Sequence, residues 1–156
     1  MKKLLSLFAV LLVAFSVSAQ VIEKPYIESR YKAAVGAIDI VEITITEDAT
    51  LVMLETNTPR NVEDMWISFS SKTTLTYPGH SYQIEAWGLW DVNELQTKEF
   101  DTQYGMGPGK CYNLVLIFPT IPADVDKISI EENFRDGFYW RGIHLTSSDS
   151  ANSEAE

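Results

Sequence analysis

Apolar and polar side chains alternate along much of the chain, with the period of two that is typical of β-strands. The clearest alternation is in residues 41–46, where Val41, Ile43 and Ile45 share one face and polar residues occupy the other. Turn-forming pairs such as Pro78-Gly79 separate these stretches. Strands are therefore predicted at residues 41–46, 50–56, 65–70, 73–77, 82–87, 110–119, 126–132 and 138–145.

The longest apolar run outside the N-terminal segment is KCYNLVLIFP, residues 110–119. Both of its faces are apolar from Leu114 to Phe118, whereas a strand on the surface of a sheet would show one polar face. Prolines close to both ends of the run leave too little room for a helix. We therefore expect a central strand that is covered on both sides.

Two predicted strands change the parity of their apolar residues. Ile38 and Ile40 are out of phase with Ile43, so either the strand begins near Ile40 or a bulge shifts its register there. In residues 138–145 the parity changes at Gly142, where a second bulge is expected.

Residues 89–101 carry the one helical indication of the chain after its N-terminal segment. Asp91 and Glu94 have the spacing of a capping box, although a single turn or a structured loop fits so short a segment equally well. The glycine-rich residues 103–109 lack the Lys-Ser or Lys-Thr pair of a phosphate-binding loop. Seven or eight short strands with at most one short helical turn predict an all-β, two-sheet antiparallel sandwich, with a barrel as the alternative.

The first 19 residues have the features of a cleaved secretory signal peptide. Lys2 and Lys3 precede an apolar segment at residues 4–15, and Ala19 closes a small-x-small cleavage site. An uncleaved anchor is the alternative, but the segment is short for a membrane span. The predicted organisation is a signal peptide at 1–19, a lead-in at 20–37, a β-sandwich domain at 38–146 and a disordered acidic tail at 147–156.

Charge adds to this picture of an exported protein, either periplasmic or extracellular and without a membrane span after cleavage. The chain has 12 basic and 22 acidic residues and a formal charge of −10. The leader holds two of the basic residues and no acidic one, so the remainder has 10 basic and 22 acidic residues and a charge of −12. Such a field repels nucleic acid and anionic membrane surfaces, so neither is an expected partner.

No motif in the sequence indicates catalysis, and we expect no enzyme activity, no cofactor and no metal site. His80 and His144 are the only histidines, and G-x-S-x-G is absent. Carboxylate pairs arise by chance among 22 acids, and Asp124-x-Asp126 lacks the rest of a calcium-binding loop. The single cysteine, Cys111, is expected to be a small buried residue at the start of its strand.

Aromatic side chains are the best candidates for ligand contacts, because exposed rings stack on sugars and anchor protein partners. The candidate ligand-binding residues are Trp87, Trp90, Tyr104 and Tyr139. Trp87 has the polar parity of its strand, and Trp90 lies in the irregular segment at 88–109. The alternative is that these rings cover a sheet or close the ends of the sandwich.

The segments IVEITITEDATLVMLET, MWISF, NLVLIFPTIPADVDKISIEE and FYWRGIHL follow one another between Ile38 and Thr146. In this succession the chain resembles a small immunoglobulin-like β-sandwich module of secreted Bacteroidetes proteins, a family mostly of unknown function. The resemblance implies an immunoglobulin-like sandwich in an exported protein, and it supplies no active site. Residues 88–109 depart most from the family pattern.

A complete strand pattern without a catalytic constellation predicts a secreted, non-catalytic module that binds or scaffolds in the cell envelope, with a protein or glycan as its partner. The alternative is a carbohydrate-binding module that uses Trp87 and Trp90. A small hydrolase is a third hypothesis, which requires a pocket where a histidine or a carboxylate pair converges.

Overall fold

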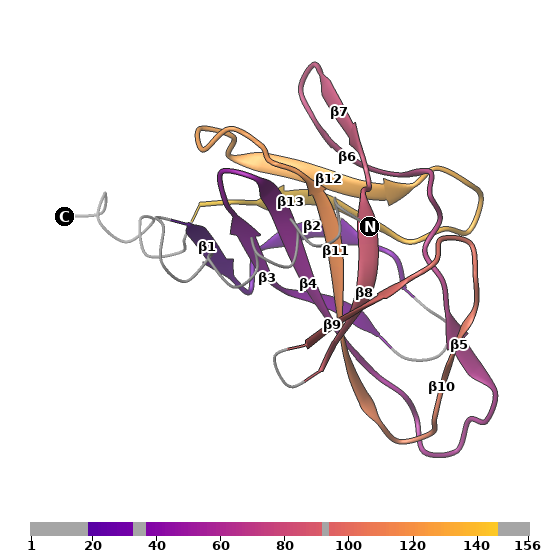
Figure 1. Cartoon of the computed structure of the whole chain (residues 1–156). Coiled ribbons are helices and arrows are strands. Elements are labelled where there is room, and N and C mark those ends of the chain that lie inside the picture. Colours follow the sequence, from indigo (N-terminus) through magenta and orange to yellow (C-terminus); the bar gives the residue numbers. More distant parts are fainter. Residues whose placement is uncertain (1–18, 33–36, 92–93, 147–156) are drawn as a thin grey trace.

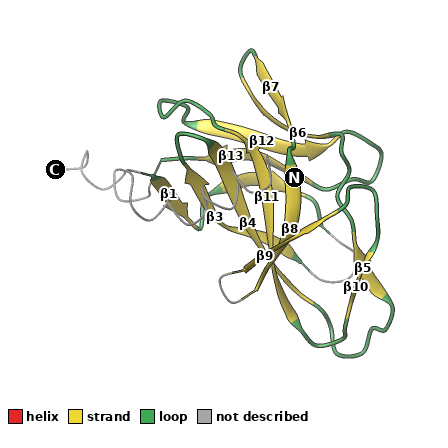
Figure 2. Ribbon diagram, viewed as in Figure 1, coloured by secondary structure: helices red, strands yellow, loops and turns green. Residues whose placement is uncertain are grey.

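The structure is a computed structural model that describes residues 19–32, 37–91 and 94–146. Within these residues the chain forms 13 strands and no helix (Figure 2). The strands are β1 (Gln20–Glu23), β2 (Ile27–Arg30), β3 (Ile38–Ile45), β4 (Ala49–Asn57), β5 (Met65–Ile67), β6 (Thr73–Tyr77), β7 (His80–Gln83), β8 (Ala86–Asp91), β9 (Glu94–Lys98), β10 (Tyr104–Met106), β11 (Cys111–Pro119), β12 (Lys127–Glu132) and β13 (Tyr139–His144).

The strands pair antiparallel in three sheets. The largest has the order β1-β3-β4-β11-β8-β9, the second has the order β2-β13-β12-β6-β7, and β10 pairs with β5 alone (Figure 1). The predicted central strand is confirmed, because β11 lies between β4 and β8 and residues 114 to 118 are all buried.

The hydrophobic core lies between the two larger sheets, and both contribute to it. Its largest fully buried side chains are Trp87, Trp140, Phe69 and Phe118. The indole N–H of Trp87 donates to the Glu99 carbonyl (3.2 Å), and that of Trp140 donates to the Ile38 carbonyl (3.3 Å). Each ring therefore buries its apolar body and still satisfies its polar atom.

Both predicted bulges are present. The pairing of β3 with β4 shifts between Ile40 and Glu42, so the strand continues through Ile40 instead of beginning there. The pairing of β12 with β13 shifts where Ile128 faces Ile143 and Ile130 faces Trp140, which leaves Gly142 in the bulge with a φ of +63°.

The helical expectation for residues 89–101 is wrong, because strands β8 and β9 pair there as a hairpin. Trp90 faces Leu95 across the hairpin, and Asp91 faces Glu94, so the spacing that suggested a capping box belongs to a pair of opposing strand ends. Cross-strand pairing of apolar residues outweighs a weak local helix signal.

The predicted lead-in also takes part in the sheets. Strand β1 forms an edge of the six-stranded sheet, and β2 forms an edge of the five-stranded sheet, so the segment at 19–32 joins the two layers. The expected signal peptide and acidic tail lie outside the described residues, apart from Ala19. No helix long and apolar enough to cross a membrane occurs in the part of the chain that the structure describes.

Candidate ligand-binding groove

Two neighbouring cavities lie where one end of the five-stranded sheet meets the small β5–β10 sheet. The larger has a volume of about 880 Å³ and is bordered by the end of β2, by β12 and β13, and by the connection between them. The smaller, of about 410 Å³, extends toward β5 and the residues before β10. Both are lined by Tyr31, Glu132, Phe134 and Asp136, so together they form one depression, here called the groove.

Aromatic rings line the groove and remain open to solvent. Trp66 on β5 is 55% exposed, and Phe134 in the β12–β13 connection is 53% exposed. Tyr31 packs edge-on against Phe138 and Tyr139, with ring centroids 5.4 and 6.1 Å away. Large exposed rings beside a cavity are typical of surfaces that bind sugars or protein segments.

Charged side chains stand among these rings. The guanidinium of Arg141 lies over the Tyr139 ring, 4.3 Å from its centroid, and donates two hydrogen bonds to Glu131 (2.6 and 3.3 Å). Arg30 is paired with Asp39, and its side chain also borders the groove. The Arg141 pair fixes the orientation of Tyr139, since the cation and the ring attract each other.

The carboxylate of Glu132 joins the two walls of the groove. Its Oε1 accepts the backbone N–H of Ser70 (2.8 Å), and its Oε2 accepts that of Phe138 (2.9 Å). Burial raises the pKa of Glu132 above its usual value, and the two N–H donors oppose that shift. Glu132 therefore ties the loop after β5, the strand that carries Trp66, to the β12–β13 connection, which carries Phe134.

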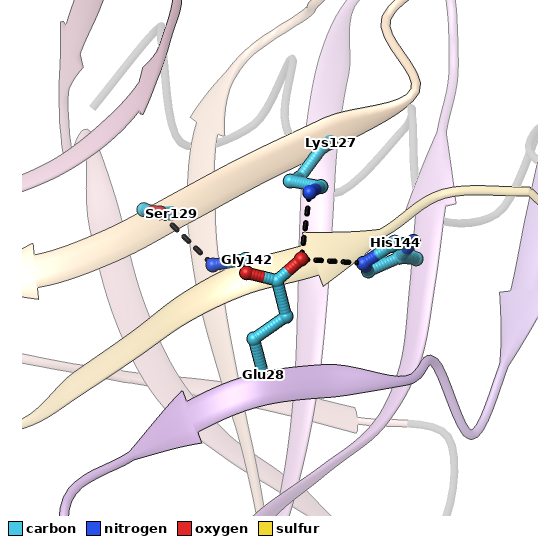
Figure 3. Close-up of polar contacts among 5 residues, drawn as sticks. All are labelled: Glu28, Lys127, Ser129, Gly142 and His144. Atoms are coloured by element: carbon cyan, nitrogen blue, oxygen red, sulfur yellow. Dashed lines mark hydrogen bonds and ion pairs between the residues drawn. The ribbon is translucent and has the colours of Figure 1, made fainter.

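A second polar cluster lies on the exposed face of the five-stranded sheet. One oxygen of Glu28 on β2 contacts both Lys127 Nζ (2.6 Å) and His144 Nε2 (2.9 Å), as Figure 3 shows. Hydrogen bonds from Lys127 and then from His144 lower the pKa of Glu28. The three groups are between one third and one half exposed, and neither cavity of the groove is lined by them. The cluster ties the edge strand β2 to β12 and β13.

The four predicted ligand residues do not come together. Trp87 is fully buried against Phe69 in the core, so its expected surface position is wrong. The predicted strand at 82–87 is interrupted at residues 84 and 85, between β7 and β8. The alternation of faces seen in residues 82–84 therefore does not continue to Trp87. Trp90 is half-buried on the opposite face of the same sheet.

Tyr104 and Tyr139 lie in two further places. Tyr104 belongs to the β5–β10 pair, where the Lys98 ammonium lies 4.8 Å from its ring centroid. Tyr139 is the predicted candidate that lines the groove.

Two groove residues, Trp66 and Phe134, are not among the four candidates predicted from the sequence. For Trp66 a signal existed, because it alternates with the buried Ile67 and shares its parity with two serines. Phe134 lies outside any alternating pattern. Its one distinguishing feature in the sequence is that an apolar ring stands between a charged strand and the turn at Asp136. Only the fold brings both rings to one depression.

The other residues considered for chemistry are separate from the groove. Cys111 is exposed, which corrects the expectation of a buried residue, because it begins β11 opposite the exposed end of β4. Local desolvation raises the pKa of its thiol, and the charge of Glu55 adds to this. Among the described residues, no group of three or more histidine, cysteine, aspartate or glutamate side chains is arranged to hold a metal ion.

Comparisons with known proteins give no relative: no family model matches the chain, and neither a curated protein nor a solved structure does.

Proposed function

We propose that this protein is a secreted, non-catalytic module that binds a ligand of the cell envelope in the groove, on a framework of the immunoglobulin-like sandwich type. The observation that carries the proposal is the pair of half-exposed rings, Trp66 and Phe134, beside connected cavities of about 880 and 410 Å³. Apolar rings exposed to this extent are costly to keep in water unless a partner covers them.

The arrangement of groups supports binding more than catalysis. The Glu132 oxygens are occupied by backbone N–H donors, and Arg141 is paired with Glu131. Neither His80 nor His144 lines the groove. These polar groups of the groove are therefore held by structural partners, and the two histidines, the side chains that most often act as a general base, lie elsewhere.

A protein segment of the envelope is the ligand that we propose first. The groove combines rings with both signs of charge, namely Arg30, Lys32 and Arg141 beside Glu131 and Asp136. Such a mixture suits a polypeptide, which offers apolar, charged and backbone groups together.

A carbohydrate is the second candidate, and the smaller cavity favours it. Trp66 is accompanied there by Asp101, Gln103 and Ser68, whose oxygens can accept or share hydrogen bonds with sugar hydroxyls. This is the arrangement of a stacking platform with polar neighbours, although the rings differ from Trp87 and Trp90, which the sequence had suggested.

The test uses a peptide library of envelope proteins and a glycan array, each probed with the wild-type protein. The double variant Trp66→Ala, Phe134→Ala should lose at least tenfold in affinity for any ligand found, because anchor residues carry most of the binding energy. The matched control is Trp90→Phe, a ring change on the far face of the other sheet, which should bind as the wild type does. Equal binding by the double variant would show that the ligand is held elsewhere.

A further inference from the structure

The smaller cavity of the groove, here called the ring pocket, differs from the larger one in the charge of its lining. Three basic side chains border the larger cavity, namely Arg30, Lys32 and Arg141. No lysine, arginine or histidine of the described residues borders the ring pocket, where the charged groups are the carboxylates of Asp101, Glu132 and Asp136. One end of the groove is therefore acidic, whereas the other carries both signs of charge.

Aromatic rings form the apolar part of the ring pocket. They are Tyr31, Trp66, Phe134 and Phe138. A positive charge is attracted to the face of an aromatic ring, and pockets lined by several rings bind cationic groups in this way. Within the described residues, the two cation–ring contacts are on Tyr104 and Tyr139. Trp66 and Phe134 therefore have no cation of the described chain over them, and their faces are available to one from a ligand.

The carboxylates of the ring pocket can meet a ligand cation without the loss of a buried ion pair. Glu132 is held by its two backbone N–H donors. Asp101 accepts a hydrogen bond from the Ser71 hydroxyl (3.2 Å), and Asp136 lies 3.8 Å from Arg135 with both side chains almost fully exposed. An ion pair so exposed contributes little, so Asp136 can exchange it for a cation of the ligand.

We propose that the ring pocket receives the positively charged side chain of a lysine or arginine in the bound protein segment. The proposal rests on the proposed function, since it names the part of the ligand that enters one end of the groove. The methylene stem of such a side chain packs against rings, and its charged end meets the carboxylates. A volume of about 410 Å³ is near the lower end of the range for ligand pockets, about 300–1,000 Å³, and suits one side chain.

The test titrates the isotope-labelled protein with the N-acetyl amides of lysine, arginine, norleucine and glutamate. Norleucine is the matched control, because it keeps the straight apolar stem of lysine and lacks the charge. The indole N–H resonance of Trp66, assigned with Trp66→Phe, reports binding in the ring pocket. The lysine and arginine probes should bind at least about fivefold more tightly than norleucine, and glutamate should bind most weakly. The preference should fall as salt is raised to about 0.5 M, because salt screens the charges.

The double variant Asp101→Asn, Asp136→Asn removes two charges and keeps the shape of the ring pocket. Both aspartates have positive φ, 58° and 63°, a conformation that asparagine also adopts readily, so the backbone should stay in place. This variant should lose the preference for lysine and still bind norleucine. The control variant Asp48→Asn, Asp124→Asn changes the net charge equally at exposed positions outside both cavities, and it should keep the preference.

The inference is overturned if lysine and norleucine shift Trp66 with equal affinity, if glutamate binds best, or if no probe shifts Trp66. A preference for lysine that survives in Asp101→Asn, Asp136→Asn would also overturn it. Equal affinity of lysine and norleucine at Trp66 leaves the proposed function standing. A ligand from the peptide library or glycan array that binds without moving Trp66 contradicts both proposals.

Discussion

The groove and the outer face of the six-stranded sheet are both apolar surfaces with a tryptophan, but they differ in shape, exposure and charge. The outer face, here called the outer-face patch, holds Ala49, Leu51, Met53, Ala86, Trp90, Leu95, Val115 and Ile117. The groove is hollow, its rings Trp66 and Phe134 are more than half exposed, and charged side chains stand between them. The patch is built on the regular face of a sheet, and Val115 and Ile117 at its centre have no exposure.

The contrast shows that the presence of aromatic residues does not by itself locate a binding site. A ring on a regular strand has neighbours on both adjacent strands, which cover it, as for Trp90 beside Leu95. A ring at a strand end or in a connection has few such neighbours, as for Phe134. Exposure at strand ends and connections, more than the presence of a ring, is therefore what makes Trp66 and Phe134 candidates for ligand contact.

The largest expected effect is a loss of stability at the patch. Ile117→Ala should lower the free energy of unfolding by about 3 kcal/mol, because it removes buried methylene groups and leaves a cavity. Val21→Ala is the control, since Val21 lies on β1, the edge strand of the same sheet, and is 50% exposed. Urea unfolding measures both. A loss below about 1 kcal/mol for Ile117→Ala would mean that the patch is open, like the groove.

The next effect concerns the support of the groove. Glu132→Gln should cost about 2 kcal/mol, because an amide can accept only one of the two N–H groups now bound by the carboxylate. Trp66→Ala should change stability by less than about 0.5 kcal/mol, as expected for an exposed side chain. Equal losses from the two substitutions would remove the distinction between support and contact residues.

The pH dependence of stability gives Glu132 a signature of its own. Burial raises the pKa of Glu132 in the folded protein, so the folded state holds this proton to higher pH than the unfolded state does. Its contribution is therefore most favourable below the ordinary carboxyl pKa and is lost as the pH rises through the folded-state pKa. Glu132→Gln should remove this fall from the curve of unfolding free energy against pH, and an unchanged curve would contradict the shift.

A smaller effect separates backbone strain from side-chain crowding in the five-stranded sheet. Gly79 and Gly142 both have positive φ, but an added Cβ meets nothing within 4 Å at Gly79, whereas at Gly142 it collides with the Glu28 carboxylate. Gly79→Ala should cost about 1 kcal/mol from strain alone. Gly142→Ala should cost more, and it should also displace Glu28 from Lys127 and His144, which the His144 resonances in NMR spectra would report.

The smallest effect on stability is expected for Arg141→Ala. Its pair with Glu131 is exposed to solvent, so the urea midpoint should stay within error of the wild type. Affinity for a groove ligand should fall several-fold, because Tyr139 loses the cation that orients it. Arg141→Lys keeps the charge but loses one of the two hydrogen bonds to Glu131. Its affinity for the ligand should therefore lie between those of the wild type and Arg141→Ala. A wild-type affinity in Arg141→Ala would exclude Tyr139 from the binding surface.

Much of the strand pattern could be predicted from the sequence. Apolar residues on both faces predicted strand β11, and the turn at Pro78 predicted the end of β6. A change of parity predicted the bulge at Gly142. These are local signals, and burial on one or two faces enforces them.

The site could be predicted only in part, since Tyr139 alone of the candidates lines the groove. Trp87 was predicted on the polar face, but a break in the strand at residues 84 and 85 turns it toward the core. The sequence continues to alternate through this break, so the pattern does not reveal it. Phe134 and Trp66 are 68 positions apart, and their approach depends on how the β5–β10 pair packs beside the larger sheet, which no local pattern contains.

The most direct test of ligand binding in the groove is fluorine NMR of the protein labelled with 5-fluorotryptophan. Its four tryptophans are two in the core, Trp90 in the patch and Trp66 in the groove, each assignable by substitution with phenylalanine. Titration with a ligand selected from the peptide library or glycan array should shift the Trp66 resonance and leave Trp87, Trp140 and Trp90 in place. A saturable shift of Trp90 with Trp66 unchanged would contradict the account.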